Sequence, residues 1–300
     1  MARSASGTAI LMAASVGIIL SMGACAGTEN GPVIGTPAQA SAPVAAAEDN
    51  LSLSGLQQQL ATQLQQAEQT QSDPGGSVFA AEVAALVSDQ ALLSSERISQ
   101  LQQLGDNQIV TLEGELTSLT GDVQNTSGLS SGQAGAIENV IRQVNHQLQS
   151  LAAKIAADTL VDVLRTDVLS VDSSTRVEGL ISPEVHTALG ADSLLVAANL
   201  LSTQAASLST RIQANVGVNQ ANEEQTLGNL QGDITSMNST GSSVAAQALA
   251  LSPSGFPGNQ GEMASLNSEL SASSGLPTSG HQEVASISTC LADDQVPQTC

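Results

Sequence analysis

Apolar residues recur at alternating steps of three and four positions along three segments of the chain. In residues 109–123, 137–155 and 194–212, leucine, isoleucine, valine and alanine follow this spacing, with mostly polar residues between them. Such spacing places one narrow apolar stripe on each helix, as in coiled coils and helical bundles. No stripe lasts for four heptads, which favours an antiparallel helical bundle or helical hairpins over a long two-stranded rod. We therefore expect an all-α fold with coiled-coil-like seams.

The same pattern predicts where several helices begin and end. Leucines at helical spacing predict a helix over residues 53–67, and a second helix is expected from Ser77 to Leu104, where Gly105-Asp106-Asn107 breaks or bends it. The stripe that begins at Ile137 continues with a shift in phase to Val171. A single helix from about Gly135 to Asp172 would be about 55 Å long.

Two later boundaries depend on capping signals. Ser182-Pro183-Glu184 predicts the start of a short helix that ends at Gly190. Farther along, the stripe positions become Asn215, Asn219 and Asn222. Either a helix continues through these polar positions, or Asn222 caps a new helix that carries Leu227 and the apolar positions after it.

The expected organisation has four parts. Residues 1–24 are a signal peptide, and residues 25–49 hold a lipidated cysteine and a disordered, flexible tether rich in Ala, Gly, Pro and Thr. Residues 50–238 form the helical bundle. Residues 239–300, rich in Ser, Gly and Pro, are expected to form a loosely packed, loop-rich C-terminal tail with short helices and a disulfide.

Composition and charge narrow the range of partners. The 300 residues contain 28 acids against seven bases, for a net charge of −21. Nucleic acid is not expected as a partner, and anionic membrane surfaces would repel the chain. Apolar residues make up 41%, but Trp and Tyr are absent and only Phe79 and Phe256 are aromatic. The core is therefore expected to be aliphatic.

The N-terminus has the layout of a secretory signal. Arg3 precedes the apolar run Ala9–Leu20, and the small residues Ser21, Gly23 and Ala24 follow it. The run is too short to cross a bilayer, which needs about 20 apolar residues. No later stretch is expected to be long and apolar enough to form a transmembrane helix.

Met22-Gly23-Ala24-Cys25 resembles the lipobox of bacterial lipoproteins. The resemblance covers residues 1–25 only, and Met22 stands where that class usually has leucine. It implies that the Cys25 sulfur carries a diacylglycerol with palmitate-type chains and that cleavage occurs just before Cys25. Ala24-Cys25-Ala26 is also an A-x-A site, at which cleavage after Ala26 would release a secreted protein without an anchor.

Two further cysteines, Cys290 and Cys300, are expected to pair in an exported protein. No catalytic residue, cofactor site or metal site is predicted. Gly128-Leu129-Ser130-Ser131-Gly132 matches G-x-S-x-G, but a helix rather than a strand is predicted before it, so we interpret it as a loop. His146 and His186 are expected at the surface. Asp158 and Asp162 share a helical face, where an ion pair between Asp162 and Arg165 is the simpler interpretation.

These observations predict a non-enzymatic envelope protein. We expect an exported, lipid-anchored helical module on the outer side of the cytoplasmic membrane or on the cell surface, with Cys25 as its link to the membrane. It would bind or scaffold an envelope protein or associate with itself. One alternative is a carrier that holds an apolar ligand between its helices, and another is a secreted protein without an anchor.

Overall fold

A computed structural model describes residues 45–70, 74–215 and 217–292. Described residues all belong to one compact unit, Pro43–Cys300. They are helical with short connections and contain no strand, which confirms the all-α bundle. The predictions for Cys25, the signal peptide and residues 25–44 of the tether fall on residues outside the described part. Residues 45–49, expected in the disordered tether, are instead the first residues of helix α1.

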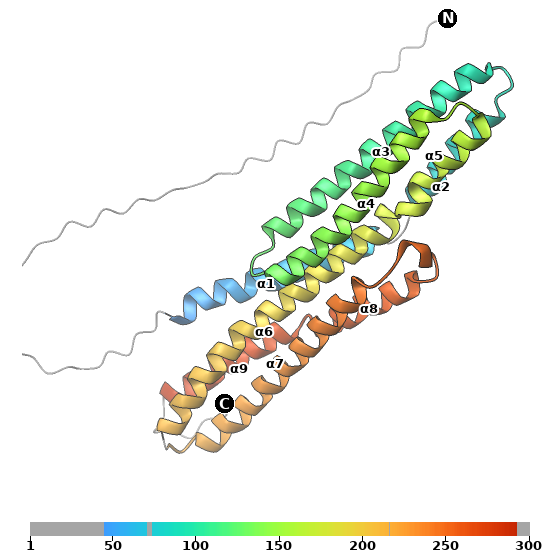
Figure 1. Ribbon diagram of the computed structural model, residues 1–300. Coiled ribbons are helices and arrows are strands. Elements are labelled where there is room, and N and C mark those ends of the chain that lie inside the picture. The colour runs from blue at the N-terminus through green and yellow to red at the C-terminus, as the bar shows by residue number, and fades with distance from the viewer. Residues whose placement is uncertain (1–44, 71–73, 216, 293–300) are drawn as a thin grey trace, which may run out of the picture. The chain divides into compact units, whose positions relative to one another are not determined.

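The elements follow one another with few residues between them (Figure 1). In chain order they are α1 Ala45–Thr70, α2 Pro74–Ser88, α3 Ser94–Asn125, α4 Ser131–Ala157, α5 Val161–Thr175, the π-helical turn η1 Val177–Ile181, α6 Ser182–Ala214, α7 Gln220–Ala248, the 3₁₀ turn η2 Pro253–Gly255, α8 Gln260–Ser273 and α9 Leu276–Ala292.

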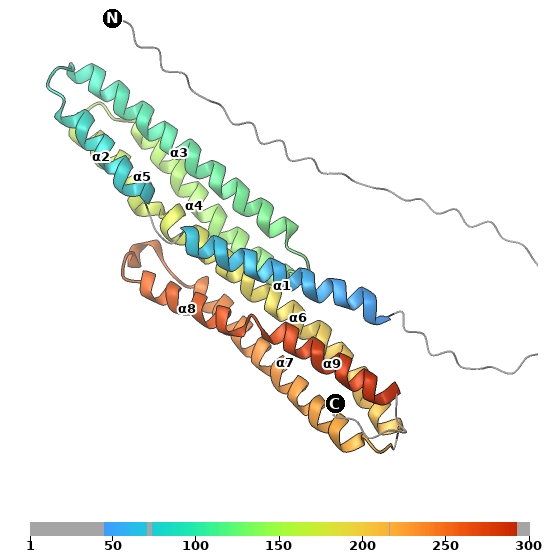
Figure 2. The same ribbon diagram turned by 180° about the vertical axis from the view of Figure 1, so that it is seen from behind.

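The apolar side chains gather in two cores. The first, the α2–α5 core, is formed by α2, α3, α4 and α5 and is closed by η1 and the first turns of α6. The second, the α6–α9 core, is formed by α1, α6, α7, α8 and α9. Figures 1 and 2 show α3 and α4 running antiparallel in one part and α6 and α7 running antiparallel in the other.

The predicted stripes are the buried seams of these cores. On α3, α4 and α6 the stripe residues are buried, and they are Ile109, Leu112, Leu116, Leu119 and Val123; Ile137, Ile141, Val144, Leu148, Leu151 and Ile155; and Leu194, Ala198, Leu201, Ala205, Leu208 and Ile212. Burial of aliphatic side chains stabilises the fold by about 1.5–3 kcal/mol for each large side chain. The three-four spacing thus located the core positions of these helices correctly.

The α5–η1–α6 segment links the two cores. α5 ends at Arg176, which has a left-handed backbone with φ of 48°, and η1 leads directly into α6. Every residue from 179 to 194 is buried. By length and composition Val161–Ala214 could cross a membrane, contrary to expectation, but its most apolar window is 72% buried. Such burial is typical of a core helix.

The single helix expected over residues 135–172 is in fact two helices. α4 ends at Ala157, and the chain turns at Asp158, Thr159 and Leu160 before α5 begins. The amide of Gln102 on α3 donates to the carbonyls of Ile155 and Asp158, at 3.1 and 3.3 Å. This long-range contact satisfies carbonyls that a helix end leaves without partners.

The helix expected over residues 77–104 is also interrupted, at residues 89–93. Asp89 Oδ1 accepts a hydrogen bond from the backbone N–H of Ala91 at 2.9 Å, and the Glu96 carboxylate accepts one from the backbone N–H of Leu93 at 2.9 Å. These two local hydrogen bonds stabilise the turn.

Two glycines that were expected to end helices do not do so. Gly105 does not break α3, and Gly190 lies within α6. A Cβ at Gly190 would lie 3.0 Å from Leu270 and 3.3 Å from Leu60, so Gly190 allows α1 and α8 to pack closely on α6.

The C-terminal region differs most from expectation. α7 continues to Ala248, past the expected boundary at residue 238, and α8 and α9 contribute Leu266, Leu270 and Ile287 to the α6–α9 core. Residues 239–292 therefore belong to the bundle rather than to a loose tail. The structure also decides between the two alternatives at Asn215, Asn219 and Asn222. The helix does not continue, because α6 ends at Ala214, and the new helix α7 follows Asn219 rather than Asn222.

Candidate functional site

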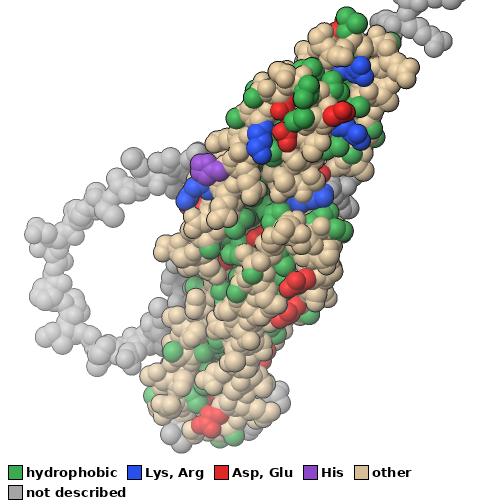
Figure 3. Space-filling model, turned by 45° about the vertical axis from the view of Figure 1, so that its right-hand side comes forward, with side chains coloured by type: hydrophobic (Ala, Val, Ile, Leu, Met, Phe, Trp, Pro, Cys, Tyr) green, Lys and Arg blue, Asp and Glu red, His purple; other side chains and the backbone are tan. Residues whose placement is uncertain are grey.

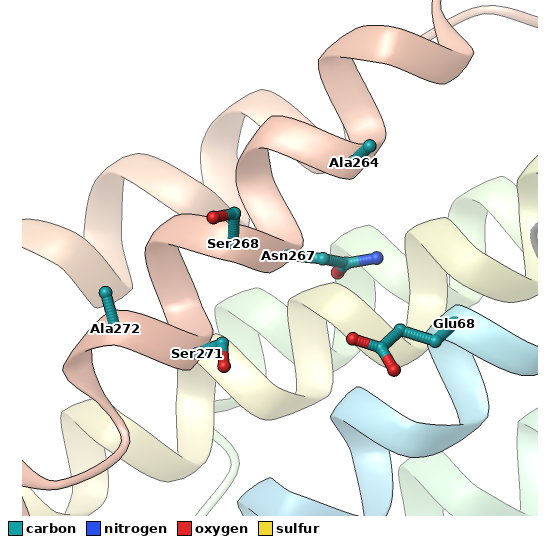
Figure 4. A pocket seen from close by; sticks show the side chains of 6 residues that line it. All are labelled: Glu68, Ala264, Asn267, Ser268, Ser271 and Ala272. Carbon is teal, nitrogen blue, oxygen red and sulfur yellow. The ribbon is translucent and has the colours of Figure 1, made fainter.

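A surface hollow of about 490 Å³ lies between α1 and α8. Small side chains on α8 leave this space open, and Glu68 of α1 faces them. Figure 4 shows the side chains of Glu68 and Asn267 pointing into the same space between the two helices. The lining residues are Glu68, Ala264, Asn267, Ser268, Ser271 and Ala272. The hollow therefore presents hydroxyl, amide and carboxylate groups rather than an apolar surface.

Asn267 connects the hollow to the interior. Its side chain is 4% exposed, and its Oδ1 accepts a hydrogen bond of 2.6 Å from Thr187 Oγ1 on α6. Asn267 Nδ2 has no hydrogen-bond partner in the described part of the chain. A buried amide donor without a partner costs about 1–3 kcal/mol. Asn267 is therefore the group at this hollow with most to gain from a new hydrogen bond.

A second buried contact, next in sequence to the Asn267–Thr187 hydrogen bond, joins α1 to α6. His186 Nδ1 lies 2.8 Å from Gln63 Oε1, and both side chains are buried. Burial lowers the pKa of His186, and the nearby Asp122 carboxylate opposes that shift. A neutral imidazole that donates from Nδ1 to the amide oxygen satisfies both groups. His186 was expected at the surface, and its burial corrects that expectation.

Two carboxyl groups are buried on the same helix. Glu184 is 1% exposed, neither of its oxygens has a partner in the described residues, and burial raises its pKa to about 8. Burial also raises the pKa of Asp192 to about 6, although a hydrogen bond from Gln133 opposes this shift by lowering the pKa. Glu184 is thus mostly protonated at neutral pH, because an unpaired buried carboxylate is strongly disfavoured.

Comparison with protein-family models, curated proteins and solved structures finds no match.

The arrangement on α6 offers hydrogen-bonding groups in neutral form. Within residues 45–70, 74–215 and 217–292, no three His, Cys, Asp or Glu side chains come together as a metal site. The carboxyl of Glu184, the imidazole of His186 and the hydroxyl of Thr187 lie within about one turn of buried helix rather than in an open cleft. His186 and Thr187 join α6 to α1 and α8 through their hydrogen bonds, and Thr187 reaches the α1–α8 hollow through Asn267.

The residues predicted to carry modifications lie mostly outside the described part. Cys25 and Cys300 are among the residues that the structure leaves undescribed, whereas Cys290 lies in α9 and is 1% exposed. The lipid at Cys25 and the disulfide between Cys290 and Cys300 remain predictions.

The other candidates take structural positions. Gly128, with φ of 83°, and Ser130 lie in the loop between α3 and α4, where Ser130 Oγ caps α4 by accepting from the Gln133 amide at 3.2 Å. The G-x-S-x-G match is therefore a helix–helix loop, as interpreted from the sequence. His146 is exposed on α4, as expected.

Asp158 and Asp162 do not share one helical face, because Asp158 is the C-cap residue after α4 and Asp162 lies in the first turn of α5. Burial, and after it the neighbouring Asp167, raise the pKa of Asp158. No local pattern in the sequence indicates the Asn267–Thr187 and His186–Gln63 contacts. They join residues that are 80 and 123 positions apart in the chain.

Proposed function

We propose that this protein is an exported, lipid-anchored helical module that binds or scaffolds other components of the cell envelope. The lipid at Cys25 would hold it on the outer side of the cytoplasmic membrane or on the cell surface, and its partner would be another envelope protein or a second copy. No enzymatic activity is proposed. The lipobox resemblance of residues 22–25 carries the proposal.

The position of the first helix supports this arrangement. Nineteen residues separate Cys25 from Ala45, where α1 begins. Nineteen residues can span up to about 65 Å when fully extended. A linker of this length is sufficient to let the bundle reach partners at a distance from the membrane.

The packing of the seams favours binding at the surface over carriage of a ligand in the interior. Leu112, Leu148, Leu201 and Leu230 are completely buried, and the stripes on neighbouring helices face one another. An apolar ligand between these seams would have to displace well-packed leucines, at a cost of several kcal/mol. The hollows that the described residues form are open at the surface instead.

The anchor is tested by the intact mass of protein extracted from the membrane fraction of producing cells. We expect a chain that begins at Cys25 and carries acyl mass, and we expect Cys25→Ser to lose both the added mass and the membrane retention. A chain that begins at Gly27 and appears in the medium would show instead that the protein is secreted without an anchor.

Binding and carriage are separated by a second measurement. The Cys25→Ser protein, purified from the medium, is extracted with organic solvent and analysed for lipid. We expect less than one lipid per chain for a surface-binding module. Stoichiometric lipid in the extract would contradict the proposal and favour the carrier.

A further inference from the structure

A groove runs along α2 where it faces α3. It consists of two adjoining hollows of about 400 and 560 Å³, which share Glu82 and Leu104. Its apolar lining comes mainly from α2 and the turn after it, with Leu104 from α3, and consists of Val78, Phe79, Ala85, Leu86, Leu92 and Leu104. The rest of the α3 side is polar, with Gln100, Asn107, Gln108 and Thr111. The groove follows most of the length of α2, a helix of 15 residues. An α-helix of that length is about 22 Å long.

The groove exists because α2 presents apolar residues on more than one side. Phe79 and Val83 enter the α2–α5 core, and α2 packs against α5 as well as α3. Val78 is 59% exposed, and Ala81, Ala84 and Ala85 are exposed beside it. An apolar helix surface of this extent on a folded protein is typical of an interaction site.

The charges at the groove are acidic. Glu82 and Asp89 are its charged lining residues, seven positions apart along α2 and the following turn. Arg97 is the nearest base in sequence on α3, and its Nη1 donates to the Val87 carbonyl at 3.2 Å. Most of the other bases of the α2–α5 part, Arg142 and Lys154 among them, lie on α4 and α5.

Figure 3 shows how the charges spread over one face. Lys and Arg side chains lie over the upper half in that view with Asp and Glu side chains among them, and the lower half carries acidic patches on a mostly uncharged surface. α4 packs against α3 and α5. The α2–α5 part is acidic as a whole, and Glu82 and Asp89 are the carboxylates of that part that line the α2–α3 groove.

We propose that the α2–α3 groove binds an amphipathic helix with basic flanks, supplied by a partner protein. An apolar stripe at positions i, i+3, i+4 and i+7 would fill the groove between Phe79, Leu86 and Leu104. Lys or Arg beside the stripe would face Glu82 and Asp89. Helix-in-groove binding of this kind takes its affinity from the apolar stripe and its orientation from the flanking charges.

This inference deepens the binding role proposed above but does not depend on the lipid anchor. It can be tested on the full mature chain with Cys25→Ser, so failure of the anchor and failure of the groove are separate results. Because the chain contains no Trp and no Tyr, a single Trp in a synthetic peptide gives a fluorescence signal of its own.

The probe is a 15-residue helical peptide with Leu and one Trp on the apolar stripe and Lys at the other positions. We expect its Trp emission to shift to the blue on saturable binding to the chain. A matched peptide with Glu in place of Lys is expected to bind at least about tenfold more weakly, because it is repelled by the acidic rim. Equal binding of both peptides would overturn the proposed basic partner.

Two pairs of variants locate the binding. Ala85→Arg fills the groove and adds a positive charge, and Ala206→Arg makes the same change at an exposed position of a hollow on α6 and α7. Glu82→Lys reverses a rim charge, and Glu262→Lys makes the same reversal on α8. Ala85→Arg is expected to weaken binding at least about tenfold and Glu82→Lys several-fold, whereas both controls stay within about twofold of the unchanged protein.

Circular dichroism checks that the variants keep their helical content. If Ala85→Arg unfolds the protein, Glu82→Lys still tests the groove, because Glu82 is exposed. Equal loss in each variant and its control would show that the peptide binds the acidic surface as a whole, and no blue shift would show that no apolar groove is filled. Displacement of the peptide by one equivalent of a fatty acid would assign the groove to an acyl chain. Each of these results overturns the proposal.

Discussion

The guanidinium carbon of Arg176 lies 4.3 Å from the centroid of the Phe256 ring. Arg176 is the residue with a left-handed backbone between α5 and η1, and its Nη1 forms an i, i+4 ion pair with Asp172 Oδ2 at 3.5 Å. Phe256 directly follows η2, in the connection between α7 and α8. The contact therefore holds this connection against the α5–η1–α6 segment that links the two cores. It is a cation–π contact between parts of the chain that are 80 positions apart.

We expect this contact to contribute about 0.5–1 kcal/mol to stability, because the ring and the cation are partly shielded from water. A double-mutant cycle with Phe256→Leu and Arg176→Gln, followed by urea unfolding, measures it. The two changes together should cost less than the sum of the single changes by that amount. Strict additivity would show that Phe256 contributes through packing alone.

A second prediction concerns pH. The pKa of Glu184 is raised to about 8 by burial, and that of Glu115 to about 7 by burial and by the neighbouring Glu178. Both acids hold their protons more tightly when folded, so unfolding releases protons above pH 4.5. The free energy of unfolding should therefore fall as pH rises from about 4.5 to about 8, most steeply between about pH 5 and 7 where both acids contribute, and should level off above about pH 8.

Glu184→Gln tests the source of this loss. Glutamine resembles the protonated acid and cannot ionise, so the variant should gain stability over the unchanged protein as pH rises, by on the order of a few kcal/mol at pH 9. The exposed Glu269→Gln is the control for the removal of one carboxyl. Urea unfolding at several pH values gives the comparison, and parallel curves for Glu184→Gln and the unchanged protein would contradict the prediction.

A third prediction uses two glycines of α7. A Cβ at Gly241 would lie 2.8 Å from Leu195 Cγ and 2.9 Å from the Ala191 carbonyl oxygen, whereas a Cβ at Gly232 would meet nothing within 4 Å. Gly241→Ala should force α6 and α7 apart and destabilise the protein by about 1–3 kcal/mol. Gly232→Ala should stabilise it by about 0.5–1 kcal/mol through helix propensity. Thermal unfolding distinguishes the two, and equal shifts would argue against a close α6–α7 approach.

A fourth prediction concerns the bond behind the α1–α8 hollow. Thr187→Val removes the hydroxyl that donates to Asn267 Oδ1 and leaves a buried amide without a partner, at a cost of about 1–3 kcal/mol. Thr187→Ser keeps a hydroxyl at the same position and should cost less. A smaller loss for Thr187→Val than for Thr187→Ser would show instead that the methyl group, which valine keeps and serine lacks, stabilises the protein more than the hydrogen bond does.

The sequence pattern predicted most of the fold where helices have a regular apolar stripe. The seam positions from Ile109 to Val123 and from Ile137 to Ile155 are buried as predicted, because the spacing of three and four residues is itself the cause of their burial. Helix ends were harder to predict. Gly190 resembles a terminator in sequence, yet α1 and α8 pack over it and keep the helix intact.

The C-terminal helices and the buried polar groups were missed for a related reason. Ser, Gly and Pro between residues 239 and 280 suggested a loop, but Gly280 allows α9 to approach Leu201, and packing overrides the weak helix propensity of the segment. His186 and Glu184 lie near a proline in a polar stretch that resembles a surface turn. Their burial depends on α1, α3 and α8 closing around α6, which no local pattern reveals.

The α5–η1–α6 segment has a consequence for the way in which the protein unfolds. Since one helical segment supplies side chains to both cores, neither core can lose its structure without exposing apolar surface in the other. The two cores should therefore melt in a single cooperative transition, with amide hydrogens on both sides of η1 exchanging at similar rates. Loss of packing in one core should therefore reach the other core through the shared segment.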